Sequence, residues 1–458
     1  MNRYQKLISN TGIFAIGNFG SKFLQFLLVP VYTHFLSRSS FGTVDLLSTT
    51  VSMLLPLVSL SVFDAVFRFS MDSSIPHKKT FTNGTIIVII LLALCTSLIP
   101  LFNLFGIPYG KLVYLLLSAN IINSLFQNFI KAIGKSKSFA ISGILNTIFT
   151  ATANIYFIYI NNLTVYTYLV SMLLGIGFSI VYLIFKLNIK RNFSLNHLDF
   201  SYSKKLLRYS IPLIPNALSW WLTSDATRFF ILFFVGVSGN GLYAVANKIP
   251  SLLTMVFSVF SQSWQISAVE EYNSIDNDKY YTKIFNALAV LLIIATACLL
   301  TVLKPLMKIM VSPLFFESWH CVPFLLLSVM YSNLSAFLGT TYIASKKTVG
   351  LMTTTIMGTV ANIFLNFLLV PLFGIQGAVM GGAIGFLLVL TIRIKNTAKF
   401  IKINVDWNKI IGGHIILVIM ILLEFLIVNV YILTLFEFIL LSILLFINKS
   451  YINTILIP

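Results

Sequence analysis

The sequence opens with two membrane-length apolar runs, TGIFAIGNFGSKFLQFLLVPVYTHFL at residues 11–36 and GTVDLLSTTVSMLLPLVSLSVFDAVF at residues 42–67, joined by a short polar turn. In the first run, Asn18, Lys22 and Gln25 are spaced i, i+4 and i+7, which places them on one face of a helix. A lysine near the middle of a membrane costs roughly 3 kcal/mol unless it faces water or a partner. This hairpin therefore predicts an aqueous interior.

The second run repeats the polar face. Its polar residues recur at helical spacing, and the other faces carry Leu, Val, Met and Phe. The members of this stripe are Asp45, Ser48 or Thr49, Ser52, Pro56 and Ser59. Both helices of the hairpin are thus expected to turn a polar side away from lipid.

The composition of the whole chain indicates a membrane protein. Of its 458 residues, 58% are hydrophobic and only 10% are charged, with a mean hydropathy of +0.93, which leaves too few charges to cover a soluble domain. Long apolar runs such as residues 86–105 lack the alternation of a barrel strand. We therefore expect an all-α polytopic membrane protein.

Spans of roughly 20 residues predict about fourteen transmembrane helices. The expected spans are 11–36, 42–67, 82–105, 112–132, 139–160, 164–186, 208–235, 242–268, 283–303, 320–344, 349–371, 376–394, 410–429 and 432–447. With a cytoplasmic N-terminus, most of the 31 Lys and Arg fall in cytoplasmic segments, so both termini are expected inside. Orientation and anionic lipid head groups account for the net charge of +18, and no nucleic-acid partner is expected.

Short similar segments in the two halves of the chain indicate an internal repeat. The run YLLLS at 114–118 returns as FLLLS at 324–328, and ANI at 153–155 returns at 361–363 with nearly the same offset. An even number of spans in each half gives both halves one orientation, which is the parallel type of transporter repeat. The sequence therefore predicts two six-helix lobes around a central cavity.

The predicted divisions are an N-terminal six-helix lobe at 1–186, a cytoplasmic linker at 187–207, a C-terminal six-helix lobe at 208–400 and an additional helix pair at 401–458. The linker contains a candidate amphipathic helix for the membrane surface, with Leu198, Tyr202 and Leu206 on its apolar side. A second basic loop, beginning with Arg393, leads into the final pair, which has no repeat mate.

The seventh and eighth runs are the repeat mates of the opening hairpin. In the seventh, Trp221, Asp225 and Arg228 lie at i, i+4 and i+7, so Asp225 and Arg228 can pair on one helix face. The eighth run carries Lys248 near its outer end, beside a polar stripe. The stripe consists of Asn247, Ser251, Thr254, Ser258, Gln262 and Gln265.

Polar faces on the first, second, seventh and eighth runs predict a cavity with Lys22, Arg228 and Lys248 as its cations and Asp45 and Asp225 as its acids. Cations in a membrane cavity suit an anionic group such as phosphate or pyrophosphate. Two alternatives stay open. Asp225 and Arg228 can form a structural ion pair, and Asp45 and Lys248 can extend to the outer interface.

Prolines interrupt these same runs, and a proline inside a helix removes a hydrogen bond and bends the helix. They are Pro30, Pro56, Pro212, Pro215 and Pro250. Bends at these places would suit alternating access, although proline is also common in membrane helices without such a role.

The sequence offers no metal or cofactor motif. Its three cysteines form no CxxC pair and its five histidines no HExxH, so neither a disulfide nor a metal site is expected. The longest predicted outer loop, 304–319, carries Glu317 as its one acid, which disfavours a membrane glycosyltransferase or polysaccharide polymerase. We therefore expect no enzyme.

Several segments resemble the polysaccharide repeat-unit flippases of the MATE-like MOP exporter superfamily, which also holds the lipid II flippases. These are NFGSK at 18–22, VPVYT at 29–33, FGTVDL at 41–46, RFFI at 228–231 and GLYAVANKIP at 241–250. The resemblance implies that an undecaprenyl-pyrophosphate-linked oligosaccharide moves from the inner to the outer leaflet of the bacterial cell membrane, for capsule, exopolysaccharide or O-antigen assembly. Membrane lipids, a polysaccharide polymerase and export machinery are the partners it implies.

On this resemblance, Lys22 and Arg228 contact the pyrophosphate or sugar and Lys248 assists near the outer side. Asn18 and Gln25 share the face of Lys22 and are counted with these substrate-binding residues. The acids Asp45 and Asp225 tune these charges or bind a coupling cation, with Na+ and H+ both open. A MATE-type cation-coupled multidrug exporter is the main alternative. Family members often place aspartate directly before the arginine, where this chain has Thr227.

Overall fold

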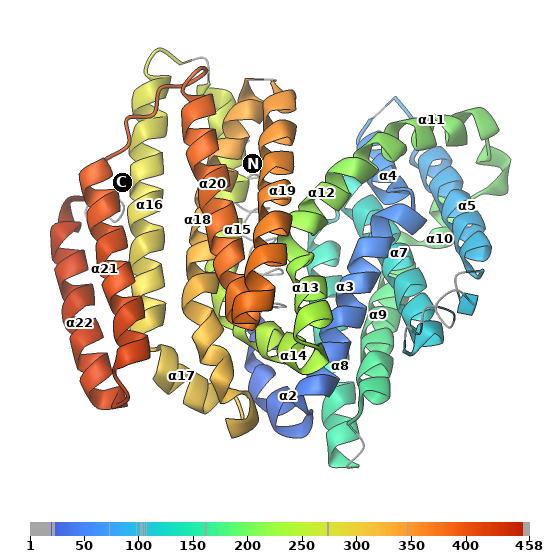
Figure 1. The fold of residues 1–458 in the computed structure, drawn as a ribbon. Coiled ribbons are helices and arrows are strands. Elements are labelled where there is room, and N and C mark those ends of the chain that lie inside the picture. Colours follow the sequence, from blue (N-terminus) through green and yellow to red (C-terminus); the bar gives the residue numbers. More distant parts are fainter. Residues whose placement is uncertain are drawn as a thin grey trace. The chain divides into compact units, whose positions relative to one another are not determined.

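The computed structural model is an all-helical protein (Figure 1). It describes residues 20, 23–72, 74–97, 99–100, 104, 106, 108–160, 163–272, 274–345 and 347–451. The candidate residues Asn18 and Lys22 lie outside these described residues.

Eleven helices of the described chain are long and apolar enough to cross a membrane, or up to 12 if one bent pair counts as a single span. They are α3 (Arg38–Val58), α5 (His77–Cys95), α7 (Gly110–Ala132), α8 (Ser136–Tyr159), α9 (Val165–Leu187), α16 (Asn277–Thr301), Pro313–Ala344, Val349–Phe373, α20 (Ile375–Thr397), α21 (Trp407–Leu426) and α22 (Val430–Ile447). The bent pair joins α14 (Val237–Ala246) to Lys248–Ser261. The prediction of an all-α, multi-pass membrane protein is confirmed.

The chain divides into two compact units. Unit 1 consists of Met1–Leu28 and Thr43–Trp221, and unit 2 of Val29–Gly42 and Leu222–Pro458. The division falls inside α3, whose first turn belongs to unit 2 and whose remainder belongs to unit 1. The sequence-derived lobes and linker stay a prediction.

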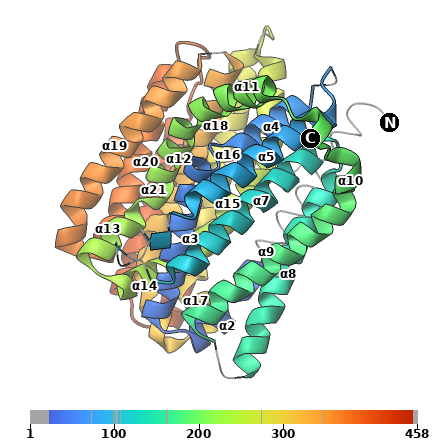
Figure 2. The same cartoon turned by 90° about the vertical axis from the view of Figure 1, so that its right-hand side faces the viewer.

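Unit 1 is built around a short helix, α4 (Val62–Ser70), which packs against α5 and α7. Val62, Ala65 and Val66 of α4 are fully buried, and Leu116 and Ile121 of α7 lie in the same apolar cluster. Two longer helices, α8 and α9, pack side by side and complete the unit (Figure 2).

The second predicted span, 42–67, is wrong as one continuous helix, because α3 ends at Val58 and α4 begins at Val62. Pro56 lies inside α3 and has no N–H for the preceding turn. Leu60 and Ser61 then take left-handed backbone angles, with φ of 48° and 51°. The carbonyl of Pro56 accepts a hydrogen bond from the Ser61 amide at 3.2 Å, which closes the break.

The predicted linker contains α10 (Ile189–Asn192), η1 (Leu195–His197) and α11 (Phe200–Ser210). Its amphipathic helix is present, but Tyr202 and Leu206 are buried in the core of unit 1, whereas Leu198 is half exposed. The prediction that this apolar face contacts the membrane surface is wrong for Tyr202 and Leu206, because α4 and α5 cover them.

Polar side chains at the start of α5 hold the linker in place, and we call this contact the linker clasp (Lys79, Thr80, Thr82 and Asn83 with residues 194–203). Asn83 donates to the His197 carbonyl at 2.9 Å and accepts from the Asp199 amide at 2.9 Å and the Ser203 hydroxyl at 2.8 Å. The Tyr202 and Thr80 hydroxyls lie 2.8 Å apart.

One ion pair completes the linker clasp. Lys79 Nζ lies 2.7 Å from the Asp199 carboxylate. The hydrogen bond from Lys79, together with those from the Tyr202 and Ser201 amides, holds the pKa of Asp199 below its ordinary value.

Unit 2 contains the remaining helices. Besides those already given, they are α2 (Val29–Phe35), the end of α12 (Ile214–Asp225), α13 (Thr227–Phe234), α15 (Lys248–Glu271), α17 (Leu303–Met310), η3 (Pro313–Cys321), α18 (Val322–Ala344) and α19 (Thr348–Phe373). Helix α20 packs against both α18 and α19, and α21 and α22 pack against α16. Figure 1 shows α21 and α22 side by side.

The segment Val29–Gly42 is bound into unit 2 at several points. The Ser312 hydroxyl donates to the Thr33 carbonyl at 2.6 Å, and Arg38 pairs with Glu317 at 2.8 Å. Gly42 meets Gly241 of α14 so closely that a Cβ on Gly42 would collide with the Val237 carbonyl oxygen. The start of α3 and α14 are therefore in direct contact.

Arg393 does not lie in a basic loop, as the sequence suggested, but is buried near the end of α20. Its guanidinium donates to the Ser335 carbonyl at 2.8 Å and to the hydroxyls of Thr354 and Thr355 at 3.1 and 3.0 Å. Backbone and hydroxyl oxygens of α18 and α19 thus satisfy this buried cation.

Candidate functional site

Asp225 and Arg228 bridge a break between two helices of unit 2. Asp225 ends α12 and Arg228 lies in the first turn of α13, with Ala226 between the helices. Arg228 Nη1 donates to Asp225 Oδ1 at 2.6 Å, so the contact predicted from their spacing is present. The Arg228 side chain is 12% exposed and the Asp225 side chain is 31% exposed, which leaves the pair partly accessible.

Neighbouring helices fix this pair in position. The Arg228 guanidinium lies 5.4 Å from the ring centroid of Tyr243, a buried residue of α14. Thr227 is buried and accepts a hydrogen bond from Asn366 of α19 at 3.4 Å. An amide partner for a neutral hydroxyl gives Thr227 a structural role in α13.

Lys248 is the first residue of α15 and lies at the bend of 43° between α14 and α15. Pro250 explains this bend, because it has no N–H with which to continue the helix from Ala246. The Lys248 side chain is half-buried. The other prolines predicted to interrupt helices also lie close to breaks, including Pro212 within η2 (Ile211–Leu213).

Unit 1 carries two of the predicted site residues. Gln25 is exposed on the short apolar helix Phe23–Phe35, and Asp45 is half-buried on α3. Two turns further along α3, the Ser52 hydroxyl accepts a hydrogen bond from the Trp221 indole at 3.2 Å. The polar stripe of α3 is thus in contact with α12 in this unit.

Three charged residues of unit 2 are buried, although the sequence did not predict a site at any of them. Lys304 of α17 pairs with Glu424 of α21, and Glu437 of α22 is also buried. The sequence assigned Lys304 to an outer loop; it lies in α17, between two candidate spans, and its side chain is 8% exposed. A lone acid inside each of two apolar runs was the available signal, since charges in membrane spans are rare.

Among the described residues, no group of three or more His, Cys, Asp or Glu side chains is arranged to hold a metal ion. The chemistry offered by the predicted site residues is therefore hydrogen bonding and charge, supplied by a guanidinium, ammonium groups, amides and carboxylates.

A family model described as a polysaccharide biosynthesis protein matches residues 7–264, more than half of the chain. The chain belongs to the polysaccharide biosynthesis protein family. The match includes the predicted site residues on both sides of the unit boundary, from Asn18 to Lys248.

Solved structures show which fold this family member has. It is similar to the lipid II flippase MurJ in an inward closed conformation, with a TM-score of 0.73 and 13% identity over 98% of this chain and 100% of that chain. An inward-facing MATE multidrug resistance transporter of the MOP superfamily gives a TM-score of 0.65 and 15% identity over 84% and 97%. A mutant of the Vibrio cholerae MATE transporter VcmN gives 0.57 and 14% over 86% and 95%.

No curated protein sequence matches the chain. This polysaccharide biosynthesis protein thus has the fold of the MurJ and MATE structures.

Proposed function

We propose that this protein is a flippase that moves an undecaprenyl-pyrophosphate-linked oligosaccharide repeat unit from the cytoplasmic to the outer leaflet of the bacterial cell membrane, by alternating access. The observation that carries the proposal is the combination of membership in a polysaccharide biosynthesis family with a fold like that of a lipid II flippase over nearly the whole chain. Lipid II is itself the substrate named for that structural relative, so a lipid-linked substrate fits both findings.

The predicted site residues suit such a substrate chemically. A guanidinium presents several N–H donors in a planar fork, so Arg228 can contact a pyrophosphate while it keeps its hydrogen bond to Asp225. Lys22 and Lys248 would add positive charge, and the amides of Asn18 and Gln25 would bind sugar hydroxyls. Asp45 and Asp225 would tune these charges or bind a coupling cation, Na+ or H+.

The membrane arrangement is part of the same proposal. It comprises about fourteen spans of roughly 20 residues, a parallel repeat of two six-helix lobes at 1–186 and 208–400, a linker at 187–207 and an added helix pair at 401–458. Both termini are cytoplasmic, because this orientation puts most basic residues inside. Membrane lipids, a polysaccharide polymerase and export machinery are the proposed partners.

The test is the pool of lipid-linked glycans in a strain that lacks the gene, separated by mass and by membrane leaflet. We expect an undecaprenyl-pyrophosphate oligosaccharide to accumulate on the cytoplasmic side while surface polymer is lost. A glycan that reaches the outer leaflet and stays unpolymerised would contradict a flippase and indicate a later step.

Variants expressed in that strain test the site. Lys22→Ala and Arg228→Ala should abolish export at normal protein levels in the membrane, whereas Lys111→Ala, an exposed lysine at the start of α7, should restore it. Normal export by the first two variants would contradict their assignment to substrate binding.

The likeness to MATE transporters supports one second candidate, a cation-coupled multidrug exporter. Amphipathic cations are its expected cargo, and a site with three basic residues repels them. Efflux of such a cation by the purified protein in vesicles would favour this candidate over the flippase.

A further inference from the structure

Three charged side chains meet at a buried junction of α17, α21 and α22 in unit 2. The side chains of Lys304 and Glu424 are 8% and 0% exposed, and Glu437 as a residue is 1% exposed. One positive and two negative groups in a low-dielectric interior do not balance. The junction therefore has to compensate one carboxylate by some other means.

The end of α21 surrounds the Lys304 ammonium with hydrogen-bond acceptors. The ammonium donates to the carbonyls of Glu424 and Ile427 at 2.5 and 3.2 Å, which belong to the unsatisfied C-terminal turn of that helix. It also lies 4.3 Å from the ring centroid of Trp319 and 3.3 Å from Glu424 Oε2. Carbonyls, an aromatic face and a carboxylate all favour a cation here.

Glu437 supplies the unbalanced group. Its Oε1 atom is buried and has no hydrogen-bond partner among the described residues. Glu437 lies on α22, which packs against α21, and its neighbours Thr434 and Phe438 line one pocket together with Pro305 of α17. An isolated ionised carboxylate is strongly unfavourable in such surroundings and takes up a proton instead.

We propose that Glu424 and Glu437 together hold one exchangeable proton beside Lys304, which makes the junction of α17, α21 and α22 a proton-binding site. With that proton the three groups carry no net charge. Because two interacting carboxyls titrate as a pair, the proton belongs to both glutamates and not to one of them.

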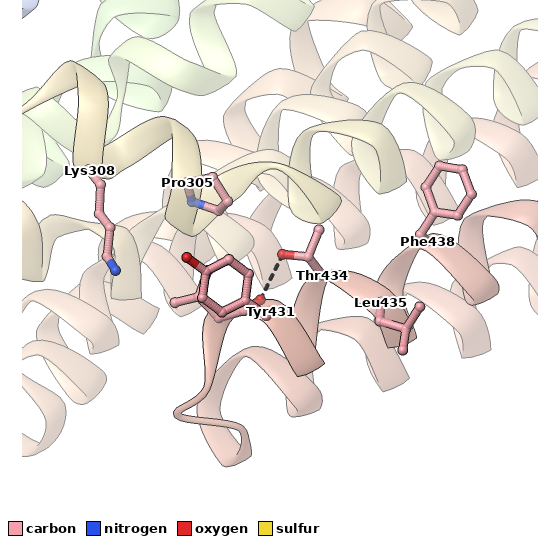
Figure 3. A pocket seen from close by; sticks show the side chains of 7 residues that line it. Pro305, Lys308, Tyr431, Thr434, Leu435 and Phe438 are labelled. Atoms are coloured by element: carbon pink, nitrogen blue, oxygen red, sulfur yellow. Dashed lines mark hydrogen bonds between the residues drawn. The ribbon is translucent and has the colours of Figure 1, made fainter.

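A pocket of about 560 Å³ next to the junction gives water a place from which this proton exchanges. Figure 3 shows Pro305 and Lys308 of α17 on one side of the pocket and residues of α22 on the other. Pro305 directly follows Lys304, and Thr434 precedes Glu437 by about one helical turn, so the pocket adjoins both partners.

Other titratable groups on the packed elements lie further away or are exposed. On α17, Lys308 is exposed at the pocket, where Tyr431 of α22 also lies. On α21, His414 stacks on Tyr331 and lies ten residues, about 15 Å, before Glu424.

Further neighbours are α2, η3 and α16. On α2, which packs against α17, His34 is exposed and its Nδ1 lies 2.7 Å from the Pro30 carbonyl oxygen. On η3, His320 stacks on Trp319 and Glu317 pairs with Arg38. On α16, Cys298 is exposed, and the charged residues stand in its first two turns, at the end opposite to the junction. Those charged residues are Asp278, Lys279 and Lys283.

Infrared spectroscopy of the purified protein in lipid tests the site, because a protonated carboxyl has a C=O stretching band that a carboxylate lacks. Near neutral pH we expect the wild type to show one such band that disappears in Glu437→Gln. Glu317→Gln, at an exposed acid, is the matched control and should leave the band unchanged.

Variants that change the number of charged groups at the junction make the infrared test more specific. In Glu424→Gln the remaining glutamate balances Lys304, so the band should again be lost. In Lys304→Met no cation remains, both glutamates should be protonated and the band should double. A purely structural role for these residues predicts neither result.

Two outcomes would overturn the proposal. One is a wild-type spectrum identical to that of Glu437→Gln, since the pair would then hold no proton. The other is loss of the band when Na+ replaces K+ at constant pH, which would assign the junction to a metal cation. Neither measurement needs a transported substrate, so the site stands or falls apart from the proposed flippase function.

Discussion

Two lysine–carboxylate pairs in this protein both meet the distance of an ion pair, but their side chains differ in exposure to solvent. In the linker clasp of unit 1, Lys79 lies 2.7 Å from Asp199 with side chains 32% and 37% exposed. In unit 2, Lys304 lies 3.3 Å from Glu424 with side chains 8% and 0% exposed. The shorter pair is the weaker one, because water solvates its charges when they separate, whereas no water replaces a lost partner in the buried pair.

The two pairs also differ in how much the neighbouring hydrogen bonds contribute. In the linker clasp, neutral hydrogen bonds of Asn83 do most of the holding and the ion pair adds to them. At the junction of α17, α21 and α22, the charge of Lys304 compensates the buried carboxylate of Glu424. Burial, more than distance, thus ranks the expected effects of substitution.

The largest effect is expected from Lys304→Met. Removing one partner of a buried ion pair destabilises a protein by about 3–5 kcal/mol, here because Glu424 loses the attraction of Lys304 and has to take up a proton. Thermal unfolding in detergent should therefore show a clear fall in Tm. Lys308→Met, one turn further along α17 and exposed, is the control and should unfold like the wild type. Equal Tm values for both variants would contradict the ranking by burial.

Asn83→Ala should have the next largest effect. The substitution removes the side chain that bonds the His197 carbonyl, the Asp199 amide and the Ser203 hydroxyl. At about 1 kcal/mol for each hydrogen bond, the loss is about 2–3 kcal/mol. Limited proteolysis should cut the linker faster. Asn120→Ala, which loses a bond only to its own helix at Leu116, should not change the cutting rate.

A smaller effect is expected from Lys79→Met. The pair with Asp199 is partly exposed, so the variant should lose less stability than Asn83→Ala, and added salt should shrink the difference from the wild type. Lys78→Met changes a neighbouring exposed lysine and serves as the control. A Tm lower than that of Asn83→Ala would show that the ion pair dominates the linker clasp.

The smallest effect is a dependence on pH. The pKa of Asp199 is lower in the folded protein than its ordinary value of about 3.9, so the ionised form stabilises the fold. This contribution is complete above that ordinary pKa and disappears as the pH falls through the lower folded pKa. Asp199→Asn should therefore have a lower Tm than the wild type near neutral pH and an equal Tm in strong acid. A constant difference would assign the effect to packing.

Hydropathy and spacing predicted much of the fold because each span is a local pattern. Most apolar runs became helices, and the i, i+3 spacing of Asp225 and Arg228 was enough to predict their contact. Amphipathicity could not decide whether the apolar face of α11 meets lipid or protein, because both are equally apolar. The break after α3 lies two residues beyond Pro56, where left-handed residues and not the proline itself end the helix.

The buried junction shows a second limit. Lys304 and Glu424 lie far apart in the chain and on different helices, and nothing local relates them. Each acid taken alone marks an unusual membrane span, but only the tertiary structure shows that Lys304 pairs with Glu424 and that Glu437 is buried. The sequence could therefore point to single residues of such a site and not to the site.

The division of α3 has a consequence for how the protein can be taken apart. Val29–Gly42 belongs to unit 2, although the chain returns to unit 1 before reaching the rest of unit 2. A polypeptide cut between Trp221 and Leu222 would yield a C-terminal piece without Val29–Gly42, the segment that contacts Ser312, Glu317 and Gly241. The N-terminal piece would hold all of unit 1 together with Val29–Gly42, whereas the C-terminal piece would lack that part of unit 2, so the two would have to be made together for unit 2 to form by complementation.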